Sequence, residues 1–82
     1  MQVLIRFATS DADAFAKAYS ENSERRDQAG LRQLQLWRED GAQALWGLFE
    51  ASDRNKVDEW LSSETGLRDT LTGTDVHYLR TA

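Results

Sequence analysis

The chain has 82 residues, which is enough for one domain, residues 1–82, with a core too small to be very stable alone. It has no cysteine and one histidine, which excludes disulfides, thiolate metal sites and multi-histidine metal sites, so we expect no metal and no cofactor. A net charge of −4 argues against nucleic acids and anionic membranes as partners, and self-association remains as the way to bury more surface.

Residues 1–8 are predicted to form a strand, because apolar side chains alternate along them. The second face of this strand carries Leu4 and Arg6, so it is mixed rather than fully polar. The apolar face consists of Val3, Ile5 and Phe7.

A helix is expected to follow, with Ser10 as its N-cap and Asp13 completing a capping-box-like pair. Its apolar stripe ends at Tyr19. How far the helix continues past Tyr19 is left open between a solvated extension and a loop, with Gly30 as the residue after the last turn.

Residues 31–38 and 43–51 are predicted to form a hairpin, because Asp40-Gly41 between them is a strong turn signal. The return strand is apolar on both faces, which is typical of a central strand covered on both sides. In the first strand we expect Leu34 and Leu36 to face the helices, and Gln33, Gln35 and Trp37 to face the other way.

A second helix is predicted to begin at Ser52 or Asp53, with Trp60 in its apolar stripe. A last short turn containing Leu67 and Leu71 is expected to end at Gly73. Residues 75–81 then form the final strand, which carries His77.

The order β-α-β-β-α-β predicts an α+β protein of the ferredoxin-like type. Right-handed crossovers place both helices on one face of a four-stranded antiparallel sheet with strand order 4-1-3-2. The other face then has no helix to cover it, and a second copy of the same sheet is the simplest cover, by an isologous contact.

The whole chain resembles the dimeric α/β-barrel superfamily, whose small ferredoxin-like domains pair sheet to sheet across a two-fold axis. The resemblance rests on the opening Met-Gln-Val-Leu-Ile-Arg-Phe, the hairpin from Leu31 to Phe49, and the stretch from Asp58 to Glu64 before the last strand. The hairpin with Trp37-Arg38 and the Leu-Ser-Ser helix are similar to muconolactone isomerases and small monooxygenase-like proteins of that group. The resemblance implies a homodimer through the open sheet face, and it carries over no catalytic residue.

His77 and Arg6 are the candidate catalytic residues, since strands 1 and 4 should be neighbours. His77 is the natural general acid or base, or an ordinary strand residue. Arg6 is suited to hold a substrate carboxylate, or else to pair with an acidic residue across the dimer. The candidate ligand-binding residues are Trp37, Trp46, Gln33 and Gln35. The alternative roles are core or dimer interface for Trp46, a position near solvent or a partner for Trp37, and hydrogen bonds between the two sheets for the two glutamines.

We therefore expect a homodimeric domain without an assigned biochemical activity, with a small-molecule ligand left open as a second partner. The alternative is a cofactor-free enzyme, monooxygenase- or isomerase-like, acting on a small cyclic or aromatic compound. The chain has no long apolar run, and its opening residues are too quickly polar for a signal peptide, which predicts a cytoplasmic protein.

Overall fold

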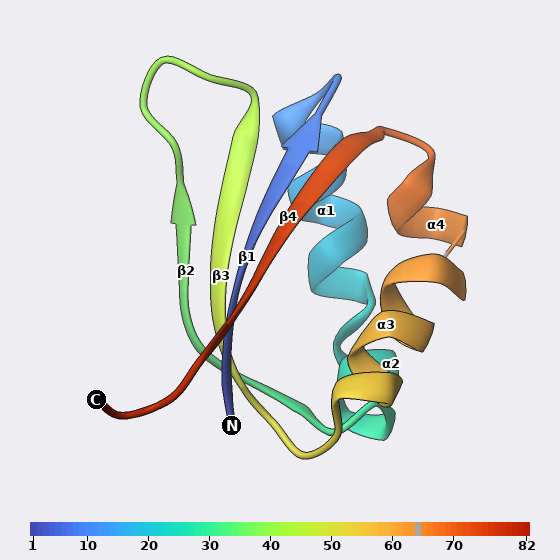
Figure 1. The fold of residues 1–82 in the computed structure, drawn as a ribbon. Coiled ribbons are helices and arrows are strands. Elements are labelled where there is room, and N and C mark those ends of the chain that lie inside the picture. Colours follow the sequence, from blue (N-terminus) through green and yellow to red (C-terminus); the bar gives the residue numbers. More distant parts are fainter. Residues whose placement is uncertain (64) are drawn as a thin grey trace.

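A computed structural model describes residues 1–63 and 65–82 of the chain (Figure 1). Four strands form one antiparallel sheet in the order β2-β3-β1-β4, which is the predicted order read from the other edge. All the helices lie on one side of this sheet (Figure 1). The elements in chain order are β1 (Gln2–Thr9), α1 (Ala12–Glu21), α2 (Ser23–Gln28), β2 (Leu31–Arg38), β3 (Ala44–Ala51), α3 (Arg54–Ser63), α4 (Thr65–Arg68) and β4 (Leu71–Leu79).

The core lies between the sheet and the helices and is rich in aromatic rings. Phe7 on β1 packs against Phe15 of α1 and Trp60 of α3, with ring centroids 5.2 and 6.2 Å apart. Phe49 on β3 also reaches Trp60, at 6.5 Å. Burying these rings removes large apolar areas from water, and this is the main stabilising term of so short a chain. The largest fully buried side chains are Phe7, Phe15, Phe49, Ile5, Val3 and Val57.

A β-bulge in β2 changes which side chains face the helices. Gln33 pairs with Phe49, whereas Gln35 pairs with Leu48, so Leu34 between them has no partner on β3. One extra residue on one strand moves the preceding side chains to the opposite face of the sheet. The prediction for Gln33 is therefore wrong, because Gln33 lies on the helix side. The prediction for Leu34 is also wrong, since 38% of its surface is exposed.

The first helix begins one residue later than the sequence predicted. Asp11, not Ser10, is the N-cap, and its carboxylate accepts a hydrogen bond from the Ala14 amide at 3.1 Å. The open question beyond Tyr19 is answered by a helical continuation, since α2 follows α1 after a break at Asn22. Gly30 then takes a positive φ of 72°, as expected after a final helical turn.

The last strand is longer than predicted at its start. Gly73, expected to end the last helical turn, lies inside β4 and pairs with Ala8. Leu71, which the sequence predicts in the same turn, opens the strand instead. The Asp53 cap is consistent with α3, because its carboxylate accepts from the Asn55 amide at 2.8 Å. Glu64, which closes the stretch used for the resemblance, lies outside the described residues.

No helix within the described part of the chain is long and apolar enough to cross a membrane.

Candidate functional site: the open sheet face and a pocket beside β4

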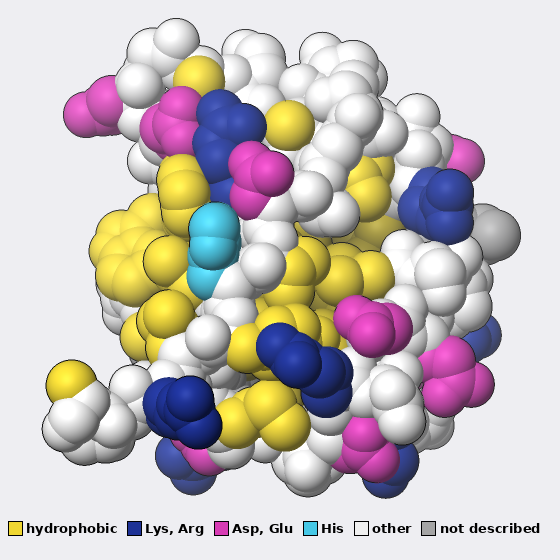
Figure 2. Space-filling view, viewed as in Figure 1, with side chains coloured by type: hydrophobic (Ala, Val, Ile, Leu, Met, Phe, Trp, Pro, Cys, Tyr) yellow, Lys and Arg dark blue, Asp and Glu magenta, His cyan; other side chains and the backbone are white. Residues whose placement is uncertain are grey.

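The sheet face turned away from the helices carries a mixed set of side chains whose positions follow from the strand register. One row across the sheet runs Gln35, Leu48, Leu4, His77, and the next runs Trp37, Trp46, Arg6, Asp75. Figure 2 shows hydrophobic side chains gathered at the left, on the side of the sheet away from the helices in Figure 1. Trp37 and Leu79 are 44% and 43% exposed there. A folded chain of this size rarely leaves so much apolar surface in water without a use for it.

Arg6 is held on this face by a partner within its own chain. Its Nε and Nη2 donate to the two carboxylate oxygens of Glu39 at 2.9 and 3.1 Å. The indole of Trp46 donates to the same carboxylate at 2.6 Å. The hydrogen bond from Arg6, followed by that from Trp46, lowers the pKa of Glu39 to about 2. Glu39 therefore fixes Arg6 and Trp46 in one ionised cluster, and the sequence did not identify this role for Glu39.

The two candidate catalytic residues do lie near each other on the open face. Arg6 is opposite Asp75 and Leu4 is opposite His77, so Arg6 and His77 are diagonal neighbours on adjacent strands. His77 is exposed. Both point away from the space between sheet and helices, which is where we would seek an enclosed substrate cavity. To bind a substrate carboxylate in the predicted way, Arg6 would have to release Glu39.

The candidate ligand-binding residues separate into two places. Trp37, Trp46 and Gln35 are on the open face, as expected. Gln33 is on the helix side, where its side-chain oxygen accepts a hydrogen bond from the Tyr19 hydroxyl at 2.6 Å. Burial raises the pKa of Tyr19 to about 12, so the hydroxyl stays protonated and Gln33 serves to satisfy it.

Across residues 1–63 and 65–82, no group of three or more histidine, aspartate or glutamate side chains is placed to hold a metal ion.

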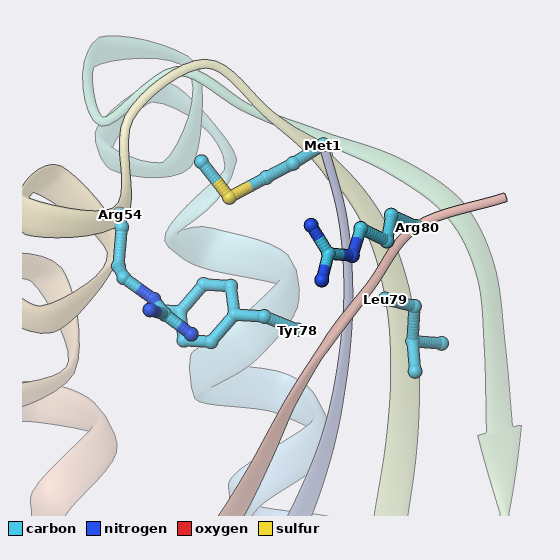
Figure 3. A pocket seen from close by; sticks show the side chains of 5 residues that line it. All are labelled: Met1, Arg54, Tyr78, Leu79 and Arg80. Carbon is cyan, nitrogen blue, oxygen red and sulfur yellow. The ribbon is translucent and has the colours of Figure 1, made fainter. Parts of the chain in front are cut away.

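A pocket between α3 and the end of β4 was not predicted from the sequence. It has a volume of about 420 Å³ and is lined by Met1, Arg54, Tyr78, Leu79 and Arg80 (Figure 3). The Arg54 guanidinium lies over the Tyr78 ring, with its carbon 3.9 Å from the ring centroid. Burial and the neighbouring Asp58 raise the pKa of Tyr78, whose hydroxyl donates to Asp58 at 3.3 Å. The only signal in the sequence is that Tyr78 and Arg80 alternate onto the same face of one strand.

Solved structures with the same arrangement place the protein among ferredoxin-like α+β domains. A NIPSNAP domain protein from Burkholderia xenovorans has a TM-score of 0.66 and 14% identity, over 100% of this chain and 95% of that one. SnoaB from Streptomyces nogalater, named as a cofactor-independent oxygenase, has a TM-score of 0.66 and 16% identity, over 99% and 93% of the two chains. A Caulobacter crescentus protein whose name points to an antibiotic biosynthesis monooxygenase has a TM-score of 0.70 and 14% identity, over 99% and 88%. These identities are low enough that the likeness establishes the fold alone.

Within that class the chain belongs to a family described as "Domain of unknown function (DUF3303)", whose model matches residues 2–66. A comparison with curated proteins gave no match. The resemblance to small monooxygenase-like domains is confirmed at the level of the fold.

Proposed function

We propose that this protein is a homodimeric domain in which two copies pack through their open sheet faces. The observation that carries the proposal is the uncovered sheet face, where Trp37 and Leu79 are more than 40% exposed beside the half-buried Leu4 and Leu48. An isologous contact between two such faces would bury these side chains on both copies at once. A stable contact of this kind needs about 800 Å² from each partner.

The charged groups on the face are compatible with contact between two copies of the same chain. Arg6 and Glu39 neutralise each other within one chain, at 2.9 Å, and Asp75 lies opposite Arg6 in the register. Arg6, Glu39 and Asp75 together leave one net negative charge on the face, which is small enough for the face to meet a copy of itself without strong repulsion. The acidic and basic groups therefore do not prevent self-association.

The test is native mass spectrometry of the purified protein at low-micromolar concentration, with two matched variants. Leu48→Lys introduces a charge at the centre of the open face, and Ala14→Lys introduces the same charge on the exposed surface of α1. We expect a dimer for the wild type and for Ala14→Lys, and a folded monomer for Leu48→Lys. A monomeric wild type, or a Leu48→Lys variant that stays dimeric, would contradict the proposal. Circular dichroism checks that both variants remain folded.

The alternative function is a cofactor-free enzyme acting on a small cyclic or aromatic compound. It is supported by the fold shared with the cofactor-independent oxygenase SnoaB over nearly the whole chain. Oxygen uptake with a panel of phenolic compounds tests it, and His77→Ala distinguishes a role for the histidine as proton carrier. No uptake by the wild type would set this alternative aside.

A cytoplasmic location belongs to the same proposal. It is supported by a chain that contains no cysteine and so gains nothing from an oxidising compartment. Cell fractionation would test it.

A further inference from the structure

We propose that the pocket of Arg54, Tyr78 and Arg80 binds a small organic anion, a carboxylate attached to a planar apolar body. The site lies within one chain, between α3 and the end of β4, and the groups that would bind the anion are not part of the proposed dimer contact. Figure 3 shows the Arg54 and Arg80 side chains entering the pocket from opposite sides, with the Tyr78 ring and the Met1 side chain between them.

The two guanidinium groups are available to a ligand. Neither Arg54 nor Arg80 forms an ion pair with any residue that the structure describes. The Glu50 carboxylate near the pocket is paired with the Met1 amino group, and the Asp58 carboxylate accepts a hydrogen bond from the Tyr78 hydroxyl without lining the pocket itself. The pocket therefore presents two positive groups and no lining carboxylate, in a protein whose overall charge is −4. Guanidinium groups are the donors that best match the geometry of a carboxylate.

The Arg54 side chain is partly organised before any ligand arrives. Its guanidinium is stacked on the Tyr78 ring at 3.9 Å, and Tyr78 is tied to α3 through Asp58. A long side chain that is already fixed loses less conformational entropy when a ligand binds. The contact also fixes the spacing between α3, which carries Arg54, and β4, which carries Tyr78.

The remaining walls select an apolar body rather than a bare inorganic anion. Met1 contributes a flexible thioether chain, and Tyr78 contributes the edge of its half-buried ring. Such side chains pack well against flat hydrophobic groups. The volume of about 420 Å³ falls in the range of small-molecule sites.

The experiment is a titration of the wild-type protein with benzoate. Binding is monitored by two-dimensional NMR of the backbone amides and the arginine side-chain Nε–H groups. We expect saturable shifts at Arg54, Tyr78 and Arg80 with a millimolar Kd. Benzamide has the same shape without the charge, and it should bind about tenfold more weakly. Inorganic phosphate, which has charge without a planar body, should also bind more weakly than benzoate.

Matched variants locate the site. Arg54→Gln and Arg80→Gln should each weaken benzoate binding about three- to tenfold. Lys17→Gln removes one positive charge from the exposed surface of α1 and should leave the affinity unchanged. The inference is overturned if benzamide or phosphate binds as well as benzoate, if the shifts do not saturate, or if neither arginine variant changes the affinity. The dispersion of each NMR spectrum shows whether a variant is folded.

Discussion

Replacing Gly47 by alanine should destabilise the protein through one specific collision in the core. Gly47 lies on the helix side of β3, two residues before Phe49. A Cβ added at Gly47 would lie 2.6 Å from two carbons of the Phe49 ring. Carbon atoms in normal contact are about 3.5–4.0 Å apart, so the ring must move by roughly 1 Å.

The ring has no free space into which to move. Phe49 is 0% exposed, and its ring packs against Trp60, which is 2% exposed. Overpacking of this kind costs about 1–3 kcal/mol, while the reduced entropy of the unfolded chain returns about 0.4–1 kcal/mol. We therefore expect Gly47→Ala to lower the free energy of unfolding by about 1–2 kcal/mol, equivalent to roughly 4–16 °C in Tm.

Urea denaturation followed by tryptophan fluorescence measures this effect, at one fixed protein concentration because self-association would add to the apparent stability. Gly73→Ala is the matched control, since Gly73 also lies in a strand but an added Cβ meets nothing within 4 Å. The double variant Gly47→Ala with Phe49→Leu should recover about 1 kcal/mol or more relative to the sum of the single changes. Additive effects, or a Gly47→Ala protein as stable as the Gly73→Ala control, would refute the collision.

Two further changes test local features of the fold. The pKa of Glu39 is about 2 in the folded protein against an ordinary value of 4.5, so its stabilising contribution is complete above pH 4.5 and is lost as the pH falls towards 2. Urea midpoints measured from pH 6 to pH 2.5 should therefore fall less steeply for Glu39→Gln than for the wild type. If the midpoints of both proteins fall equally with pH, the lowered pKa of Glu39 is wrong. Gly30→Ala should cost about 2–3 kcal/mol, because φ is +72° and the added Cβ would lie 3.3 Å from the Ser52 Cβ even after the Ser52 hydroxyl rotates away. Gly41→Ala, with φ +77° and open space around the added Cβ, should lower the free energy of unfolding by only about 1–2 kcal/mol, the cost of the backbone conformation. If both variants lose the same free energy, the contact with Ser52 has no effect.

The sheet and its order were predictable because simple alternation holds in β1 and β3. Val3, Ile5 and Phe7 are all buried, and the order of strands and helices then leaves few topologies. Alternation failed in β2, where the bulge at Leu34 moved Gln33 to the helix side. A bulge is decided by how two strands pair, and here it brings Gln33 within reach of the Tyr19 hydroxyl; neither the pairing nor this contact is visible in the spacing of residues 31–38.

For a similar reason, the sequence predicts only part of the cluster that Arg6, Glu39 and Trp46 form on the open face. The period of β1 places Arg6 on the open face, but it does not identify the partner. Glu39 lies 33 residues away, in the loop of the hairpin, and it reaches Arg6 and Trp46 only because β1 and β3 are neighbours. One of the two interpretations of Arg6 from the sequence is an acidic partner across a dimer. The structure supplies one within the chain instead.

The two proposed sites meet on β4, and this makes a further connection between them. Alternation along this nine-residue strand places His77 and Leu79 on the open face and Tyr78 on the helix side, and Arg80 follows directly after the strand. A partner that packs against Leu79 would hold the end of β4, and that end carries the ring on which Arg54 is stacked. Since a more rigid strand leaves less entropy to lose when a ligand binds, self-association should strengthen binding in the pocket, and an organic anion should by linkage strengthen the dimer.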